Sequence, residues 1–230
     1  MSEPSLNIFF GGELFTHKDL TGNALLAEAI SELSDHRYCS VLPQNLSDPI
    51  GQAQERRDQN VINLIESDLA LFCFDGTELD DGTVVEYLLA KFADIPTVIV
   101  RTDFRTGISD SKNLPWNLMA CFYPRTEIEI IDAMSVYQNI FKEFPLTEAA
   151  DVLIEKRSSD VARTLVRVIA QAVVDAFDRV LESRPLMPAE HTESVYAWLA
   201  RMPGLNRDPE QLDRLFAQAV ERKRSRNLLN

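Results

Sequence analysis

The sequence has few of the residues that build metal sites and disulfide frameworks. Its 230 residues include three cysteines and three histidines, and neither set shows metal-ligand or catalytic-triad spacing. We therefore expect no metal and no cofactor. An odd number of cysteines without a framework favours a reducing compartment, and the first residues lack the pattern of a signal peptide, so we predict a cytoplasmic protein.

Long apolar runs and positive charge are also scarce. No apolar run is long enough to span a bilayer, so we expect no contact with a membrane. Only 23 Lys and Arg residues stand against 36 Asp and Glu residues, and the formal charge is −13. A surface of this sign does not neutralise phosphates, so we expect no nucleic-acid partner.

An acidic loop between a buried strand and a helix is the most informative segment that the sequence does contain. The apolar run 69–74 is typical of a parallel strand covered on both faces. Asp75, Asp80 and Asp81 follow it, and Glu86 lies in the next helix. Open α/β sheets bind ligands beyond the carboxyl ends of their strands. Paired carboxylates at such a crevice suit glycosyl chemistry, in which one attacks carbon and another manages a proton.

A structural interpretation of the same residues stands beside the catalytic one. Thr83 and Glu86 fit a capping box, in which Thr83 begins the helix and Glu86 reaches back to a backbone amide. Asp80 and Asp81 suit a helix N-terminus through its dipole. Spacing alone does not choose between the two interpretations.

Strands and helices alternate along the first part of the chain and give way to helices alone. The patterns predict strands at 6–10, 38–42, 69–74, 97–101 and 119–123. They predict a first helix that is capped by Asp19 or Thr21. Further helices are predicted at about 50–66, 82–92, 127–144, 158–182, 192–201 and 209–224. Such alternation predicts a doubly wound, flavodoxin-like α/β fold with a five-stranded parallel sheet in the order 2-1-3-4-5. We expect an α/β domain over residues 1–145 and a helical extension over 146–230, which packs on the core or mediates oligomerisation.

Three segments, taken in order, resemble the nucleoside 2-deoxyribosyltransferase family. The first is the strand and glycine turn of residues 8–16, which contains Gly11 and Gly12. The second is the acidic loop and helix start of residues 80–86. The third is Asn117-Leu118-Met119, similar to an element that the family lends to the active site of a neighbouring subunit. The resemblance covers about residues 6–140.

The resemblance implies a retaining exchange of nucleobases on 2′-deoxynucleosides, a reaction of purine salvage. Glu86 would attack C1′ as the nucleophile, and Asp80 would transfer a proton and bind the base. A helix N-terminus would favour the ionised form of Glu86. The partners would be 2′-deoxynucleosides, free nucleobases and further copies of the chain, because Asn117 would act in trans in a dimer or hexamer.

The family's substrate-binding positions map onto a wider set of residues, with two departures from its pattern. Phe9 stands where the family usually has Tyr, and Asn60 stands where it has Asp. The amide of Asn60 can hydrogen-bond a base but cannot protonate it. The full set is Phe9, Gly11, Gly12, Leu14, Phe15, Asn60, Gly82, Asn117 and Met119. Structural roles remain open for several of them, since Gly11-Gly12 suits an ordinary turn, Asn117 suits a turn cap and Met119 suits a core position.

Two other functions remain alternatives. An N-glycosidase that hydrolyses deoxynucleosides or their 5′-monophosphates would use similar carboxylates, although Glu13 in the glycine turn argues against a phosphate site. A non-catalytic sensor of nucleobases or nucleotides would explain the helical extension as the part that contacts a partner.

Overall fold

A five-stranded parallel sheet forms the centre of the molecule. The computed structural model describes residues 4–46, 53–103, 117–144 and 154–230. The strands are β1 (Leu6–Gly11), β2 (Tyr38–Val41), β3 (Leu69–Cys73), β4 (Thr97–Arg101) and β5 (Thr126–Ile130). Their order is β2-β1-β3-β4-β5, and every neighbouring pair is parallel. The predicted fold class and strand order are confirmed.

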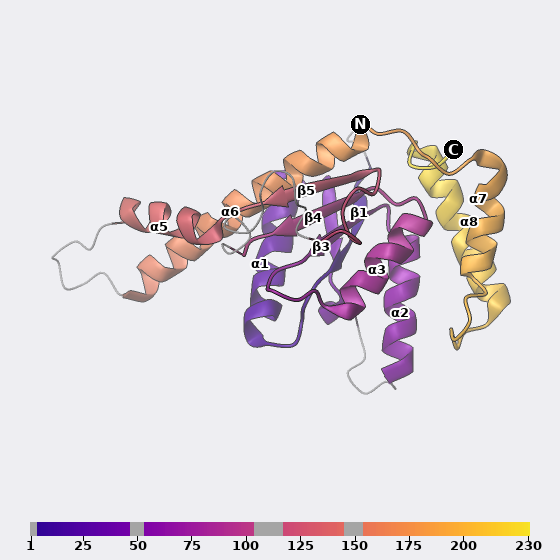
Figure 1. Ribbon diagram of the computed structural model, residues 1–230, viewed down its shortest axis with the longest axis horizontal. Helices are drawn as coiled ribbons and strands as arrows, with labels where there is room; N and C mark the ends of the chain where they lie inside the picture. The colour runs from indigo at the N-terminus through magenta and orange to yellow at the C-terminus, as the bar shows by residue number, and fades with distance from the viewer. Residues whose placement is uncertain (1–3, 47–52, 104–116, 145–153) are drawn as a thin grey trace.

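Helices cover both faces of this sheet (Figure 1). They are α1 (His17–Leu33), α2 (Ala53–Glu66), α3 (Asp81–Phe92), α5 (Ala133–Glu143), α6 (Ile154–Leu181), α7 (Ala189–Leu199) and α8 (Pro209–Ser225), with a short 3-10 helix at Pro43–Asn45. One hydrophobic core joins α1 and α6 to the sheet, and a second joins α2, α3, α7 and α8 to its other face. In Figure 1, α5 and the beginning of α6 project away from the sheet.

Alternation along β1 shows how the two cores are separated. Ile8 and Phe10 belong to the core under α1 and α6, whereas Phe9 belongs to the core under α2 and α3. All three side chains are buried. Successive strand residues point to opposite faces, so a strand covered on both sides is apolar throughout. This pattern places the end of β1 between the two layers of helices.

The prediction of the fifth strand is wrong. Residues 119–123 form a turn and a bend, which also contain Cys121. The strand is Thr126–Ile130, and all of it except Thr126 falls in the range 127–144 that is predicted as a helix. The side chain of Asn117 accepts hydrogen bonds from the backbone N–H groups of Met119 and Ala120, at 2.8 and 3.1 Å. The backbone of Phe122 is left-handed, with φ of 68°. These local features break the extended conformation, and the half-buried Thr-Glu-Ile-Glu-Ile segment takes the sheet edge instead.

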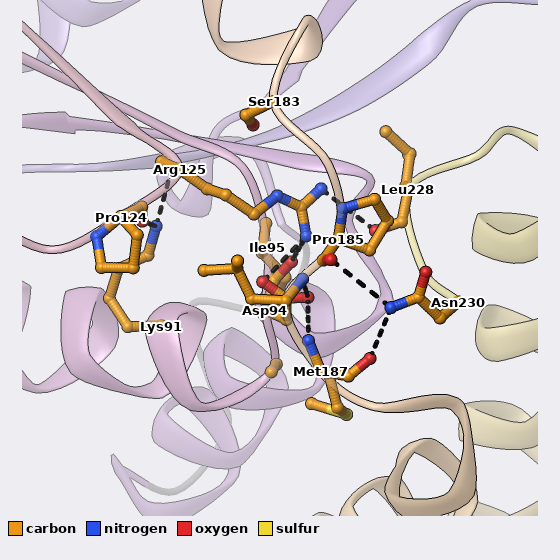
Figure 2. A network of polar contacts seen from close by, with 12 residues as sticks. Lys91, Asp94, Ile95, Pro124, Arg125, Ser183, Pro185, Met187, Leu228 and Asn230 are labelled. Carbon is orange, nitrogen blue, oxygen red and sulfur yellow. Dashed lines mark hydrogen bonds and ion pairs between the residues drawn. The ribbon is translucent and has the colours of Figure 1, made fainter.

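Buried polar contacts join the C-terminal helices to the sheet domain. Figure 2 shows Arg125 and Asp94 where these helices meet the loops at the amino ends of β4 and β5. Their ion pair spans 2.8 Å, and both side chains are at least nine-tenths buried. Asp94 Oδ2 also accepts the N–H groups of Leu186 and Met187, at 2.7 and 2.8 Å. Arg125 donates to the carbonyl of Leu228, so the chain end is held here as well.

Helix α6 lies within the core, although the sequence predicts it as the first helix of an extension. Ala170, Val173, Ala176 and Phe177 are completely buried and belong to the same core cluster as buried residues of α1 and the sheet. The predicted boundary at residue 145 lies outside the described residues, so the division into two domains stays a prediction. No helix among the described residues is long and apolar enough to cross a membrane.

Candidate active site

The glycine turn at the end of β1 lies directly against the candidate nucleophile. Gly11 pairs with Phe72 of β3 at the carboxyl edge of the sheet. A Cβ atom on Gly11 would lie 2.6 Å from Phe72 Cδ1 and 3.2 Å from Glu86 Oε2. Any side chain at this position would therefore displace the ring or the carboxylate. Close approach, rather than a special backbone angle, is the physical reason for glycine here.

Helix α3 positions Glu86, and its N-cap is Asp80. Asp80 Oδ2 accepts hydrogen bonds from the backbone N–H and the Oγ1 hydroxyl of Thr83, at 2.8 and 2.7 Å. The predicted capping box with Thr83 as the cap is therefore wrong, because the helix begins three residues earlier and Thr83 is buried in its first turn. Asp81 lies exposed in the same turn, where a negative charge suits the helix dipole. Glu86 is thus free of the backbone role that the capping box assigned to it.

The carboxyl group of Glu86 is hard to ionise. Burial raises its pKa to about 7, and the neighbouring charge of Asp80 contributes in the same direction. The net shift of the pKa is therefore opposite to the direction expected from the helix N-terminus alone. Glu86 is the sixth residue of α3, and the dipole effect is strongest in the first turn. A carboxyl that titrates near neutral pH can serve as a nucleophile or as a proton carrier.

Asp75 and Glu13 complete the acidic edge. Asp75 accepts hydrogen bonds from the backbone N–H and the hydroxyl of Thr102, which joins the loop after β3 to the end of β4. Burial raises the pKa of Glu13, and the charges of Asp19, Asp80 and Asp75 add to the effect, in that order. Glu13 and Glu86 therefore both experience the charge of Asp80. In the sequence alone, Glu13 argues only against a phosphate site.

The remaining predicted binding residues surround this edge at different depths. Phe9 is completely buried, with its ring centroid 6.1 Å from that of Phe72. Asn60 is half-buried on α2, and Leu14 is half-buried just before α1. Phe15 is exposed beside the N-cap of α1.

The first helix is also capped differently from the prediction. Its cap is Thr16, which forms a capping box with Asp19, whereas the sequence predicts a cap at Asp19 or Thr21. Gly82 lies in the first turn of α3, where a Cβ atom would lie 3.3 Å from Asp80 Oδ2. Substrate contacts for all of these residues stay predictions.

Asn117 and Met119 lie on the turn before β5. The side chain of Asn117 caps that turn, as its structural interpretation predicts. Leu118 and Met119 are 71% and 77% exposed, so Met119 is not a core residue. The left-handed Phe122 is 78% exposed in the same turn. A strained backbone that presents apolar side chains to solvent suits contact with another molecule.

The structure also reveals functional candidates that the sequence analysis missed. Val166 and Ile169 of α6 line a cavity at the same carboxyl edge, together with Glu13 and Asp75. Among the described residues, no group of three or more His, Cys, Asp or Glu side chains has an arrangement that could hold a metal ion. The apolar face of α6 indicated core packing or a subunit interface, because the distance in sequence between α6 and the acidic loop hides the cavity that both line.

Comparison with known proteins bears on the same part of the chain. The model of a family described as nucleoside 2-deoxyribosyltransferase matches residues 8–119. These residues form a nucleoside 2-deoxyribosyltransferase domain. The predicted resemblance is confirmed, and the domain includes Gly11, Asp80, Glu86 and Met119. Strand β5 and all later helices lie outside the match.

Two further comparisons complete these findings. A search of curated proteins finds no match. A solved structure described as a conserved protein from Enterococcus faecalis V583 is 20% identical, with a TM-score of 0.46, over 76% of this chain and 99% of that one.

Proposed function

We propose that the protein transfers 2-deoxyribose between nucleobases through a covalent ester on Glu86. The observation that carries this proposal is the position of Glu86. Its Oε2 atom lies against Gly11 at the carboxyl edge of the sheet, within a domain of the matching family. The absence of a side chain on Gly11 allows this close approach. Burial beside Asp80 makes this carboxyl group unlike an ordinary surface glutamate.

The reaction proceeds in two balanced steps. In the first, Glu86 attacks C1′ of a 2′-deoxynucleoside, the bond from C1′ to the base nitrogen breaks, and the base leaves with a proton. In the second, a different base attacks C1′, the ester bond breaks and the proton is returned. Two inversions at one carbon retain its configuration. Asp80 Oδ2 already accepts both hydrogen bonds from Thr83, so we assign the exchanged proton to Oδ1.

The direct test supplies a donor and a different acceptor. The protein is mixed with 2′-deoxyadenosine and free hypoxanthine, and the products are separated by chromatography. We expect 2′-deoxyinosine and adenine in equal amounts. Free 2-deoxyribose as the only sugar product would contradict transfer and establish hydrolysis. Binding without turnover would contradict both reactions and favour a sensor.

A second test identifies the residue. The protein is incubated with 2′-deoxyadenosine without an acceptor, quenched in acid and digested for mass spectrometry. We expect a deoxyribosyl adduct on the peptide that contains Glu86, and none in the Glu86→Gln variant. Glu78, an exposed carboxylate of the same loop, provides the matched control as Glu78→Gln, which keeps the adduct. An adduct elsewhere in the wild type would refute the assignment.

We also propose that Asn117 and Met119 complete the site of a neighbouring copy. The exposed apolar turn that carries them supports this assignment. Complementation between two inactive variants tests whether these residues act in trans. Glu86→Gln and Met119→Asp variants are each expected to be nearly inactive, but after dissociation and reassembly the mixture should recover about a quarter of wild-type activity, since random pairing restores one site in half of the dimers. No recovery beyond the sum of the two variants would contradict action in trans.

A further inference from the structure

Two helices of this chain begin with the same kind of cap. Helix α3 follows Asp80 and has Thr83 in its first turn, and α5 follows Asp132 and has Ser135 in its first turn. In each case the later residue donates its backbone N–H and its hydroxyl to the aspartate. Such bonds satisfy backbone groups that lack partners at a helix start. The two caps differ in which carboxylate oxygen accepts each bond.

The cap of α5 uses both oxygens of its aspartate, whereas the cap of α3 uses one. Asp132 Oδ1 accepts the N–H of Ser135 at 3.0 Å, and Asp132 Oδ2 accepts the hydroxyl at 2.6 Å. Asp80 Oδ2 accepts both the N–H and the hydroxyl of Thr83, at 2.8 and 2.7 Å. Among the described residues, none donates a hydrogen bond to Asp80 Oδ1. The cap of α3 therefore leaves one oxygen available to a ligand.

The surroundings of Asp80 hold its carboxylate in this orientation. Thr83 is buried, with 2% of its surface exposed, so water is a poor alternative partner for its hydroxyl. Gly82 lies close to the same oxygen, since a Cβ atom there would be 3.3 Å from Asp80 Oδ2. Turning the carboxylate away would leave the buried hydroxyl of Thr83 without an acceptor, which is costly. The direction of Oδ1 is fixed as a result.

Asp80 also lies beside the candidate nucleophile. Burial is the main cause of the raised pKa of Glu86, and the charge of Asp80 is the second cause. Burial, Asp19 and then Asp80 raise the pKa of Glu13. The cap of α5 has a simpler setting, because Asp132 is exposed to solvent. The cap with the free oxygen is thus the one at the acidic edge of the sheet.

We propose that Thr83 is a positioning residue, which holds Asp80 so that Oδ1 faces the leaving base and exchanges a proton with it. The proposal rests on the proposed function, in which the base leaves with a proton. As the bond from C1′ to the base nitrogen breaks, its electron pair moves to the base, and the proton on Oδ1 moves to a base nitrogen. The incoming base later returns a proton to Oδ1. A carboxyl group turned away from the base transfers this proton poorly.

Donors with different leaving groups distinguish this role from a purely structural one. Adenine leaves 2′-deoxyadenosine readily only if it gains a proton. The base of 7-methyl-2′-deoxyguanosine already carries a positive charge, so it leaves as a neutral molecule without a proton. A fault in proton transfer therefore slows the first donor and spares the second, whereas a damaged fold slows both. The quantity to compare is kcat/KM for each donor, which covers the steps up to departure of the base.

The first experiment removes the hydroxyl of Thr83. Thr83→Val keeps the size and the backbone N–H, and we expect kcat/KM to fall at least about tenfold for 2′-deoxyadenosine and less than about threefold for 7-methyl-2′-deoxyguanosine. Thr83→Ser, which keeps the hydroxyl, should restore the lost rate. Ser135→Ala at the cap of α5 is the matched control and should leave both values unchanged. Equal slowing of both donors, no slowing, or no rescue by serine overturns the proposal.

The second experiment asks whether Thr83 acts through Asp80. In the Asp80→Asn variant the amide carries no carboxyl proton to transfer. Adding Thr83→Val to that variant should therefore change kcat/KM for 2′-deoxyadenosine by less than about twofold, because the two effects are not independent. A further loss as large as that in the wild-type background would refute the positioning role.

These rates separate the role of Thr83 from the class of reaction. Release of the base is measured in the same way whether the sugar passes to another base or to water. If the wild type only hydrolyses, and Thr83→Val slows 2′-deoxyadenosine alone, the proposed function fails and the role of Thr83 stands. If transfer occurs and Thr83→Val slows both donors equally, the function stands and Thr83 serves the helix only. A wild type that cleaves neither donor refutes both.

Discussion

The carboxylates in two acidic regions of this molecule have opposite electrostatic environments. Where the C-terminal helices join the domain, Asp58, Asp68 and Asp94 are buried, and each is paired with arginine. At the carboxyl edge of the sheet, Glu13 and Glu86 both lie within electrostatic reach of Asp80. In the first region arginines neutralise the carboxylates, and in the second region the negative charges of carboxylates lie close together.

The partners at the junction come from distant parts of the sequence. Asp68 interacts with Arg222 and Arg226 of the C-terminal segment and accepts the N–H of Asn7 at 2.9 Å. Asp58 accepts the N–H of Asn206 at 2.8 Å. Removing one member of such a buried pair leaves the other charge uncompensated. These carboxylates hold the fold together, whereas the unneutralised ones at the sheet edge are available for chemistry.

The largest expected effect is on catalysis at the sheet edge. Glu86→Gln removes the proposed nucleophile while preserving size, so we expect kcat for base exchange to fall by about 10³-fold or more. Steady-state kinetics with 2′-deoxyadenosine and hypoxanthine measures it. A variant that keeps more than a tenth of wild-type activity would remove Glu86 from the mechanism.

The next largest effect is on stability at the junction. Asp94→Ala leaves Arg125 buried without its partner, so we expect the free energy of unfolding to fall by about 3–5 kcal/mol. Glu32→Ala, which breaks the exposed pair with Arg167, is the control and should change it by about 1 kcal/mol or less. Denaturant titration of both variants distinguishes the cases. Equal losses would show that the junction pair has no special weight.

The pH dependence of stability tests the acidic region at the carboxyl edge of the sheet. The pKa of Glu86 is raised from 4.5 to about 7 in the folded protein, so its contribution to stability is complete below pH 4.5 and is lost as the pH rises through 7. Glu86→Gln should therefore be more stable than the wild type by about 1–3 kcal/mol at pH 8, and by much less at pH 5. Thermal unfolding at both pH values measures the difference. A gain of equal size at pH 5 would contradict the titration.

The smallest effect isolates the influence of Asp80 on Glu86. Asn is as good an N-cap as Asp, so Asp80→Asn should change the free energy of unfolding by less than about 1 kcal/mol. Loss of its charge should lower the pKa of Glu86 below 7. The acid limb of kcat/KM, which follows ionisation of the nucleophile, should then move to lower pH while the overall rate falls. A limb that stays in place would assign the raised pKa to burial alone.

Local sequence patterns predict much of the fold because the forces involved are local. The apolar run of β3 and the period of α3 indicate their structures directly, and alternation of strands and helices implies the parallel order. The errors have local causes as well. Residues 119–123 have strand composition, but the cap of Asn117 and the left-handed Phe122 turn the chain away.

Some residues of the candidate site can likewise be predicted from the sequence, and others cannot. Gly11, Asp80 and Glu86 are identifiable because each belongs to a short motif of the family, and their proximity follows from adjacent parallel strands. The cavity wall from α6 and the arginine partners of Asp68 carry no comparable motif. Their partners lie about 90 to 160 residues away in the chain, so spacing carries no information about them.

The sequence by itself determined the family of residues 8–119, the parallel sheet and the identity of the candidate nucleophile. Only the tertiary structure decided how that nucleophile ionises and which carboxylates are neutralised. Those properties depend on burial and on charges brought together across the whole chain. Glutamate has the same intrinsic pKa wherever it occurs, and the fold determines which neighbours it meets.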